Sequence, residues 1–588
     1  SMPTGNVINR NFEEMFEIGV RFEIPFFQRG YAWEQRQWKK LFEDIQTEII
    51  DSVSGNKFED EEHFFGPIVV LEKISNHPSL KRFLVIDGQQ RITTTYLLLA
   101  VIRKLLESKA HLSTDAQKYI AELDKLVKNN ITGADDYLKL KVFSTKGDRL
   151  PTFKAVFSQN PSSPHLADDQ LLYNPDENKI DAFVKYANRQ LKNADVPVLW
   201  QWYQAIIKSL KIVWIPLDEN KDDAQAIFES LNDAGMPLSA AELLCNYIFR
   251  PLTNDVTNEH EKLHNEKWLK ARSNVGEEVF EEYLRNLFSI GEKKRVGKER
   301  RMYVHFKIKN KKPTPEVAKG TLEQILDYTN VYNQVSKPIL HPPKNTEIKT
   351  LLIAINDTNM TSIYPFLMAL LKANENNSIN DQEAAEILRE TYVLLVRRKI
   401  TSLSVTRYDT FFPSLLSKII NEPNKIKALH KQIQAEQLWV PDQVFEDAFT
   451  TKEVYNSREL NFSRHVLQEI DKSMQVFGEY PDYSTIHTIE HVLPQTLDDF
   501  WKSYLGSDST HYSLPTIINT LGNLCLNSQP ANSSFGQKPF KEKQEAYTDI
   551  SALAKDIKKR IEPWNIAAIE KRSKDLSQKA LKVWQWKN

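Results

Sequence analysis

Helical periodicity over a long central stretch is the feature that most restricts the fold. From about residue 255 to residue 475, apolar residues recur at spacings of three and four, as in 322–332, 363–371, 384–396 and 466–474. This spacing gathers apolar side chains on one face of a helix, and glycine, which weakens helices, is sparse there. We therefore predict a nearly all-helical middle region.

Strand-like runs occur on the N-terminal side of this region. Phe64–Leu71, Phe83–Ile86 and Lys211–Leu217 are rich in β-branched or aromatic residues and are bounded by turn residues or charges. The spacing of apolar residues predicts helices at 92–106, 223–231 and 239–249. The first 250 residues therefore mix strands with helices.

The C-terminal part of the chain has a sequence pattern that differs from those of the two preceding regions. After about Pro481 come short segments with turn signals, and amphipathic helices at 553–561 and 567–584 close the chain. A chain of 588 residues is too long for one hydrophobic core, since a domain holds roughly 150 residues. We predict an α+β, predominantly helical protein with domains at 1–250, 251–450 and 451–588.

Cysteine use, hydropathy and charge exclude several classes of protein. Cys245 and Cys525 lie far apart and neither belongs to a C-x-x-C motif, so neither a disulfide framework nor a Cys-rich zinc site is expected. The longest purely apolar run, 96–102, is far shorter than the roughly 20 residues that span a bilayer. We expect a cytoplasmic protein without a membrane partner. Its net charge of −1 excludes a chain that is basic throughout.

Positive charge is concentrated in one segment instead. Residues 293–312 contain ten Lys or Arg and a single acid, Glu299, with Tyr303 and Phe306 interleaved. Contact with nucleic-acid phosphates and a solvated loop between helices are both consistent with this composition.

The segment from Asp87 to Arg91 follows a strand-like run and precedes a helix. A strand–turn–helix of this kind directs backbone N–H groups and the positive end of the helix dipole at one point, which suits an anion. Gly88 permits close approach of a ligand, Arg91 offers a bidentate cation, and two glutamines add donors. The alternative is a helix that Asp87 caps, followed by a solvated polar turn.

A second cluster lies upstream. Residues 24–33 place aromatic side chains around the polar pair Gln28 and Arg29. Aromatic residues alone would indicate core, but buried polar groups need partners because unpaired ones are costly.

Together the two clusters resemble the ParB/sulfiredoxin-like proteins that contribute the N-terminal half of GmrSD-type restriction systems. Those proteins carry P-x-x-Q-R-x-Y-x-W followed by D-G-Q-Q-R. Further matches are 227–235 with Leu238-Ser239 and the weaker Asp148-Arg149, so the resemblance covers most of residues 10–250. It implies binding and hydrolysis of a nucleoside triphosphate and sensing of modified DNA.

The resemblance also implies roles for individual residues. Those placed at the nucleotide are Asp87, Gly88, Gln89, Gln90, Arg91 and Thr94, of which Asp87 and Arg91 would act in hydrolysis. Gln28, Arg29 and Tyr31 would face the same cleft, in contact with either the nucleotide or the DNA modification.

A third cluster lies near the C-terminus. Residues 486–495 look like a short strand that ends in Glu490-His491, a Leu-Gly-Asn-Leu turn follows at 521–524, and Asn532 opens a helix on which Lys538 and Lys543 would lie. A neutral histidine can take a proton from water, since its ordinary pKa is about 6.5. A hydrated Mg²⁺ held by few oxygens can neutralise charge at a phosphate. A turn with a purely structural role is the alternative.

Specific roles follow for this cluster. His491 is the candidate general base, Glu490 and Asn532 are candidate metal ligands, Asn523 would hold the histidine-bearing loop, and Lys538 would contact phosphate. The order E-H-x-x-P, L-G-N-L and N-S-S resembles the HNH (ββα-metal) nuclease domain that follows the ParB-like domain in GmrSD proteins. The third HNH position is Asn instead of His, which favours Mg²⁺ or Mn²⁺ over zinc.

The whole chain thus resembles type IV restriction enzymes of the GmrSD and BrxU kind. The resemblance implies a phage-defence endonuclease that cleaves double-stranded DNA with modified cytosines and works as a homodimer. Two alternatives remain: a phosphorothioate-sensing nicking nuclease of the SspE type, and a nucleotide-switched DNA-binding protein with a vestigial nuclease fold. Neither the modification nor the choice among ATP, GTP, UTP and CTP follows from the sequence.

Overall fold

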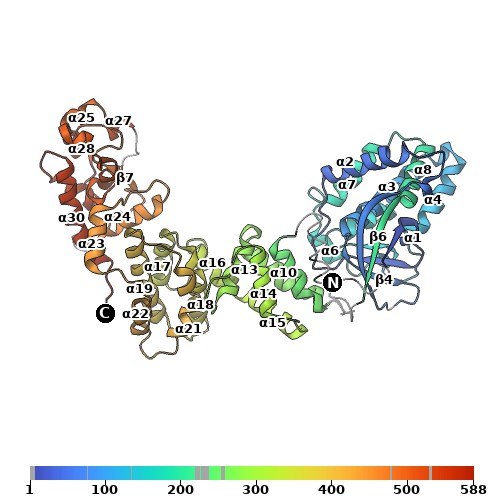
Figure 1. The fold of residues 1–588 in the computed structure, drawn as a ribbon, viewed down its shortest axis with the longest axis horizontal. Coiled ribbons are helices and arrows are strands. Elements are labelled where there is room, and N and C mark those ends of the chain that lie inside the picture. Colours follow the sequence, from blue (N-terminus) through green and yellow to red (C-terminus); the bar gives the residue numbers. More distant parts are fainter. Residues whose placement is uncertain are drawn as a thin grey trace. The chain divides into compact units, whose positions relative to one another are not determined.

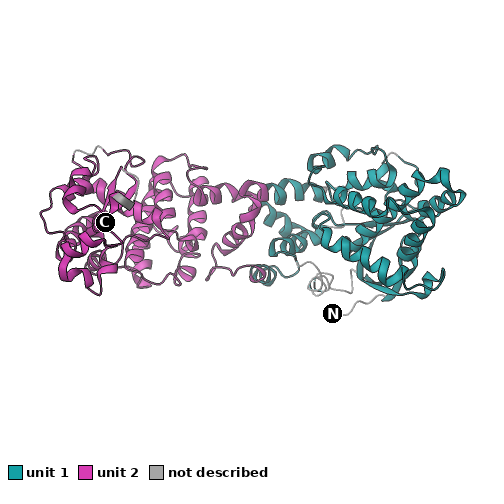
Figure 2. Cartoon of the chain, turned by 90° about the horizontal axis from the view of Figure 1, so that it is seen from above, with its two compact units in different colours: residues 1–270, 302–323 teal, residues 271–301, 324–588 magenta. Residues whose placement is uncertain are grey.

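Two compact units make up the computed structural model (Figure 2). Unit 1 comprises residues 1–270 and 302–323, and unit 2 comprises residues 271–301 and 324–588. The structure describes residues 7–75, 77–133, 135–218, 226, 229, 238–252, 259–476, 480–528 and 533–587. Helices dominate and unit 1 contains a mixed sheet, so the predicted α+β, mostly helical class is confirmed. The division into domains at 1–250, 251–450 and 451–588 stays a prediction.

A six-stranded mixed sheet forms the centre of unit 1, in the order β1-β6-β3-β4-β2-β5. Its strands β4 and β6 are labelled in Figure 1. β1 pairs antiparallel with β6, and β3 with β4, while the other neighbours are parallel. The strands are β1 (Ile8–Asn11), β2 (Val20–Glu23), β3 (His63–Lys73), β4 (Lys81–Asp87), β5 (Val142–Phe143) and β6 (Leu210–Leu217). The three predicted strand-like runs correspond to β3, β4 and β6. The other strands have two to four residues, too few for a sequence pattern to show.

Helix α3 (Gln89–Ser108) is the core element of unit 1 and confirms the helix predicted at 92–106. It begins directly after β4 and packs against α4, α5, α7 and α8. Its apolar side chains are buried on all sides, as those of Ile92 and Leu98 show. The helices of unit 1 also include α1 (Phe12–Met15), α2 (Gln35–Glu43), α4 (Thr114–Val127), α5 (Arg149–Phe157), α6 (Leu166–Leu172), α7 (Lys179–Leu191), α8 (Val196–Gln204), α10 (Ala240–Phe249) and α11 (Glu259–Leu263).

Helix α10 confirms the helix predicted at 239–249. Ser239 and Glu242 form a reciprocal capping box, in which the serine hydroxyl accepts a bond from the Glu242 backbone N–H and the glutamate side chain accepts one from that of Ser239. Most of the helix predicted at 223–231 lies outside the described residues.

Unit 2 contains the predicted helical middle. Its first helices are α13 (Phe280–Ser289), α16 (Thr329–Ser336), α17 (Thr346–Asp357), α18 (Tyr364–Glu375), α19 (Asp381–Ile400), α20 (Tyr408–Phe411), α21 (Leu415–Ile419), α22 (Lys425–Ala435), α23 (Asp442–Thr451) and α24 (Leu460–Met474). Boundaries between the units fall within α12 (Lys270–Val275), α14 (Arg300–Lys309) and α15 (Pro315–Asp327). No helix in the described part of the chain is both long and apolar enough to cross a membrane.

The C-terminal part of unit 2 carries a two-stranded antiparallel sheet of β7 (Thr488–His491) and β8 (Leu524–Asn527). Around it lie α25 (Asp499–Leu505), α26 (Leu514–Ile517), α27 (Ser533–Gly536), α28 (Phe540–Ala546), α29 (Ala552–Lys558) and α30 (Ile566–Val583). One expectation was wrong: Lys538 and Lys543 do not share a helix with residue 533. Pro539 precedes α28, so Lys538 lies between two helices and Lys543 lies on the second one.

Candidate functional sites

The turn between β4 and α3 leaves the N-terminus of α3 without a side-chain cap. Gly88 is the N-cap residue and adopts a left-handed conformation, with φ of +93°. A Cβ atom at Gly88 would lie 2.9 Å from Cγ1 of Ile68 and 3.0 Å from the carbonyl oxygen of Pro67, so a larger residue does not fit. The alternative in which Asp87 caps the helix is therefore not what the structure shows. The uncapped N–H groups and the helix dipole favour an anion here.

The aromatic Gln-Arg cluster folds back onto this turn. Gln90 accepts a hydrogen bond from the backbone N–H of Ala32 over 2.7 Å, and the hydroxyls of Tyr31 and Thr94 are 2.6 Å apart. Gln28 donates to the carbonyl oxygen of Ile86 over 3.4 Å. The structure thus brings together two clusters that lie about sixty residues apart in the sequence. The Thr94 hydroxyl is fully buried and also bonds the Gln90 carbonyl, so its bonds lie within the protein.

A third segment completes this site and was not among the predicted site residues. Asp148 accepts hydrogen bonds from the backbone N–H of Tyr31 over 2.7 Å and from the Asn178 amide over 2.9 Å. Burial raises the pKa of Asp148 to about 6. The sequence held one signal for this position, the Asp148-Arg149 match, but no local pattern connected it with Tyr31.

These segments enclose a small cavity of about 10 Å³, enough for one water molecule. It is lined by Ile24, Arg29, Gly30, Tyr31, Gln89, Gln90, Thr93, Ser144, Thr145 and Asp148. Nearby Gln28 is 6% exposed, and its Oε1 atom has no hydrogen-bond partner among the described residues. An unpaired buried acceptor is costly, so a further donor at Oε1 of Gln28 would be stabilising. A nucleotide would have to bind at the mouth of the cavity or open it.

Asp87 and Arg91 do not line this cavity. Arg91 reaches β3, where its guanidinium donates to the carbonyl oxygen of Pro67 over 3.1 Å and packs against Gly66. Burial raises the pKa of Asp87, and Arg91 opposes this shift by its positive charge. Arg29 forms an ion pair of 2.8 Å with Glu242 of α10. Of the predicted nucleotide residues, Arg29, Tyr31, Gln89 and Gln90 therefore line the cavity, whereas Asp87 and Arg91 lie outside it.

His491 is the last residue of β7, and a chain of polar contacts orients its ring. Nε2 of His491 lies 2.9 Å from Oδ1 of Asn519, whose amide nitrogen donates to the carboxylate of Glu453 over 3.3 Å. Because that amide nitrogen faces a carboxylate, its oxygen faces the histidine and Nε2 carries the proton. Nδ1 is then unprotonated, with no hydrogen-bond partner among the described residues. Neither Asn519 nor Glu453 was predicted as a site residue.

Burial also affects the charge of His491. The ring of Tyr455 packs edge-on against the imidazole, with 4.4 Å between ring centroids. Burial lowers the pKa of His491 to about 4, while the contact with Asn519 opposes this shift. The imidazole is therefore neutral at pH 7, as a general base must be.

Glu490 is separated from the His491 ring by the alternation of the strand. Glu490 is 5% exposed, and its carboxylate forms an ion pair of 3.0 Å with the buried ammonium of Lys543. The same ammonium donates to the carbonyl oxygens of His491 and Val492 over 2.8 and 2.9 Å. Burial raises the pKa of Glu490 and lowers that of Lys543, and the ion pair opposes both shifts. Lys543 thus ties the end of β7 to α28.

Asn523 holds the segment that follows His491. Its side-chain oxygen accepts from the backbone N–H of Leu493 over 2.7 Å, and its amide donates to the Leu493 and Ile518 carbonyls over 2.9 and 2.8 Å. The adjacent Gly522 packs directly on α30, where a Cβ atom would lie 2.0 Å from the carbonyl oxygen of Ile569. Only glycine fits at this crossing.

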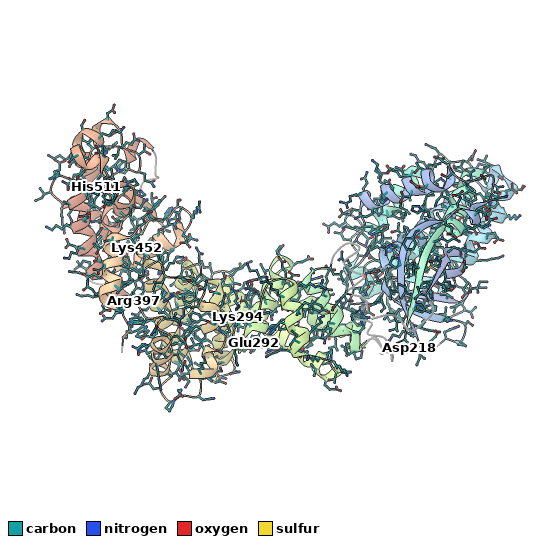
Figure 3. The ribbon with its side chains drawn as sticks, viewed as in Figure 1. Asp218, Glu292, Lys294, Arg397, Lys452 and His511 are labelled. Carbon is teal, nitrogen blue, oxygen red and sulfur yellow. The ribbon has the colours of Figure 1, made fainter. Side chains whose placement is uncertain are left out.

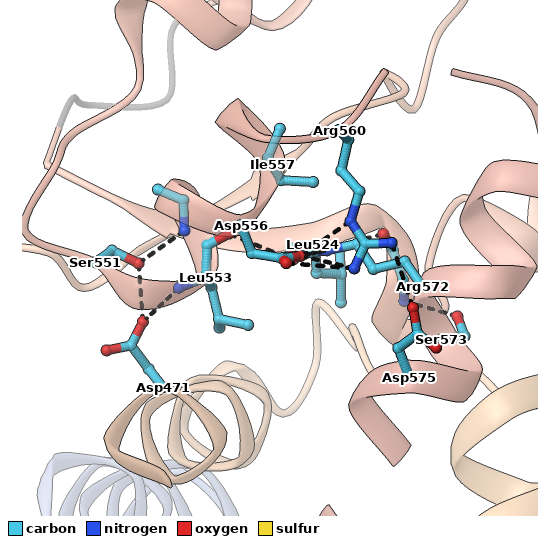
Figure 4. A network of polar contacts seen from close by, with 12 residues as sticks. Asp471, Leu524, Ser551, Leu553, Asp556, Ile557, Arg560, Arg572, Ser573 and Asp575 are labelled. Carbon is cyan, nitrogen blue, oxygen red and sulfur yellow. Dashed lines mark hydrogen bonds and ion pairs between the residues drawn. The ribbon is translucent and has the colours of Figure 1, made fainter. Parts of the chain in front are cut away.

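A buried network of polar contacts supports the segment that contains Gly522 and Leu524 (Figure 4). Arg572 of α30 is fully buried and donates to the carbonyl oxygens of Gly522 and Leu524 over 2.9 and 2.8 Å. Its Nε also donates to Asp556 of α29 over 2.8 Å. Because its guanidinium is engaged within the fold, Arg572 positions β8 and is not available to a ligand.

The predicted metal ligands do not form a metal centre in the described part of the chain. Asn532 lies outside the described residues, and the carboxylate of Glu490 already faces an ammonium. No group of three His, Cys, Asp or Glu side chains suited to a metal ion occurs among the residues described. Lys538 is exposed, and its ammonium lies 5.8 Å from the centre of the Phe535 ring. Within the described ranges, no hydrogen bond or ion pair connects Lys538 with His491.

Comparisons with known proteins give two family matches. The model for the N-terminal domain of GmrSD restriction endonuclease matches residues 8–249, and the model for the C-terminal domain of GmrSD restriction endonucleases matches residues 439–579. No curated protein matches the chain. The N-terminal match contains the cavity at α3, and the C-terminal match contains His491 and Asn523.

Proposed function

The chain belongs to the GmrSD family of restriction endonucleases, and we propose that nucleotide binding in unit 1 controls its cleavage of chemically modified DNA by unit 2. As a restriction endonuclease it acts on DNA. In this proposal the N-terminal domain is a ParB-like NTPase and modification sensor, and the C-terminal domain is an HNH nuclease. The main observation in favour of nuclease activity is that the imidazole of His491 is neutral and held in one orientation.

His491 acts as the general base of the proposed reaction. Its Nδ1 atom takes a proton from the water that attacks phosphorus, while Asn519 holds Nε2–H and so fixes the ring and its tautomer. As the new P–O bond forms, the bond between phosphorus and the 3′ oxygen breaks, and that oxygen leaves and takes a proton from solvent. The negative charge of a bound phosphate favours the imidazolium that forms. Lys538 remains the candidate phosphate contact. We also propose that cleavage requires Mg²⁺ or Mn²⁺. Glu490 does not suit the metal, because its carboxylate is paired with Lys543.

The nucleotide half of the proposal rests on the convergence at the N-terminus of α3. Backbone N–H groups without a side-chain cap, the donors Gln89 and Gln90, and the pair of Asp87 and Arg91 together suit a polyphosphate. The unpaired Oε1 of Gln28 would accept a bond from a base, a ribose hydroxyl or the DNA modification. The nucleotide, the modification and the homodimer that double-strand cutting would need stay proposals.

Cleavage of supercoiled DNA tests the function and separates it from both alternatives. The substrates are DNAs with hydroxymethylcytosine, glucosylated hydroxymethylcytosine, methylcytosine or phosphorothioate linkages, beside unmodified DNA, each with and without the four NTPs in Mg²⁺ buffer. We expect linear product from a DNA with modified cytosines. Open circles from phosphorothioate DNA would favour the nicking alternative. Binding without any cleavage would favour the vestigial one, and equal digestion of all DNAs would contradict modification sensing.

Substitution of Asp87 or Arg91 tests the nucleotide role. Asp87→Ala and Arg91→Ala should each lower NTP turnover at least tenfold, about 1.4 kcal/mol of barrier, because each removes one member of the pair. Matched controls are Asp60→Ala and Arg36→Ala, which change exposed residues of unit 1. Circular dichroism establishes that each variant is folded. Turnover at the wild-type rate in folded Asp87→Ala and Arg91→Ala would remove both residues from this role.

A further inference from the structure

The segment Lys293–Arg301, which we call the basic loop, is not explained by either site. It belongs to unit 2 and contains six Lys or Arg against the single acid Glu299 (Lys294 is labelled in Figure 3). Residues 293–299 connect α13 to α14, and Arg300 and Arg301 are the first residues of α14. Its composition alone is consistent with a phosphate-binding surface and with a solvated loop. The contacts that hold the basic loop in place bear on the choice between these two possibilities.

A buried arginine fixes the basic loop to the body of unit 2. Arg295 is 9% exposed, and its guanidinium donates to Glu282 and Asn286 of α13, each over 2.9 Å. Its backbone N–H also donates to the carbonyl oxygen of Asp409 over 2.7 Å.

The next residue is held as well. The backbone N–H of Val296 donates to the Ser289 hydroxyl over 2.9 Å, and its carbonyl oxygen accepts from Arg285 over 2.7 Å. A loop with both backbone and side-chain anchors is not a freely solvated connection.

The remaining cations of the basic loop are presented to solvent. The exposed ones are Lys293, Lys294, Lys298, Arg300 and Arg301. Four of them, namely Lys293, Lys294, Lys298 and Arg301, form no ion pair with a carboxylate among the described residues. Like charges on a fixed backbone repel one another, and the loop cannot spread to relieve this cost. An array of negative charges would relieve it.

We propose that the basic loop binds the phosphate backbone of the DNA that the enzyme cleaves. The inference rests on the proposed function and adds to it a DNA-binding surface outside both candidate sites. Duplex DNA presents one negative charge per about 1.7 Å of its axis, so cations that are close in sequence on an anchored loop can bind several phosphates together. Such interactions position DNA without reading its sequence or its modification.

The salt dependence of DNA binding tests this inference. The probe is a short, fluorescently labelled, unmodified duplex, titrated at a series of NaCl concentrations with the full-length protein. The variant Lys293→Gln/Lys294→Gln/Lys298→Gln/Arg301→Gln should bind at least tenfold more weakly at low salt. Its plot of log K against log [NaCl] should be shallower by up to about 0.9 for each phosphate that the variant no longer neutralises.

A charge-matched control separates local binding from overall charge. The variant Lys337→Gln/Lys344→Gln/Lys427→Gln/Lys431→Gln removes four exposed lysines of unit 2 and should keep the wild-type slope. Equal slopes in wild type and the loop variant, or an equally weakened affinity in the loop variant and the control, would overturn the inference. If wild type cleaves modified DNA in either case, the proposed function stands. If wild type neither binds nor cleaves any duplex, the result contradicts the proposed function as well as the inference that rests on it.

Discussion

Replacement of His491 by alanine should lower the rate of DNA cleavage by about a hundred- to ten-thousandfold, the usual contribution of a general base. The variant removes the nitrogen that takes the proton but leaves the strand pairing of β7 with β8, which uses the backbone. Its effect should lie in the chemical step, so DNA binding should change little. Single-turnover cleavage of supercoiled DNA at saturating enzyme measures this step directly.

His487→Ala is the matched control for this prediction. His487 lies four residues before His491, is exposed, and its ring bonds the carbonyl oxygen of Ser484. Its loss should leave cleavage within about twofold of wild type, since surface substitutions rarely perturb a distant step. Equal cleavage by wild type and His491→Ala would contradict the assignment of His491 as the general base.

The pH dependence of cleavage gives a second readout for the same residue. Burial lowers the pKa of His491 to about 4, and the residue acts in its neutral form. The acid limb of kcat/KM should therefore fall as pH drops through about 4 and not near 6.5, the ordinary value. Bound phosphate favours the imidazolium, so the acid limb of kcat should lie at higher pH than that of kcat/KM. An acid limb of kcat/KM near 6.5 would contradict the buried state described for the ring.

Lys543→Met should destabilise the β7–β8 region by about 3–5 kcal/mol. The substitution leaves the carboxylate of Glu490 buried without a cation and removes the donor to the carbonyls of His491 and Val492. Hydrogen–deuterium exchange of peptides from β7 and β8 measures the local effect. Protection there should fall by roughly two to four orders of magnitude, since about 1.4 kcal/mol corresponds to a factor of ten.

Two further variants show whether the ion pair is the cause. Lys541→Met changes an exposed lysine of the same helix and should leave exchange unchanged. Glu490→Gln combined with Lys543→Met removes both charges and should recover part of the protection, because no charge is left buried alone. Exchange at the wild-type rate in Lys543→Met would mean that the pair does not stabilise the strand.

Local sequence pattern determined much of the secondary structure and the order of the motifs. The apolar runs at β3, β4 and β6 and the spacing of apolar residues in α3 and α19 are periodic over enough residues to identify each element. Local pattern also identified the three clusters on which the resemblance to GmrSD proteins rests, and the comparisons confirm that family. Alternation along β7 also implies that the side chains of Glu490 and His491 face opposite ways.

Only the tertiary structure decided which polar groups meet. Asp148 reaches Tyr31 across 117 positions of sequence, Lys543 reaches Glu490 across 53, and Asn519 reaches His491 across 28. Periodicity reports whether a side chain is buried, because burial follows from the repeat of a single element. The partner of a buried polar group depends instead on which elements pack together, and that is set by the packing of the whole core.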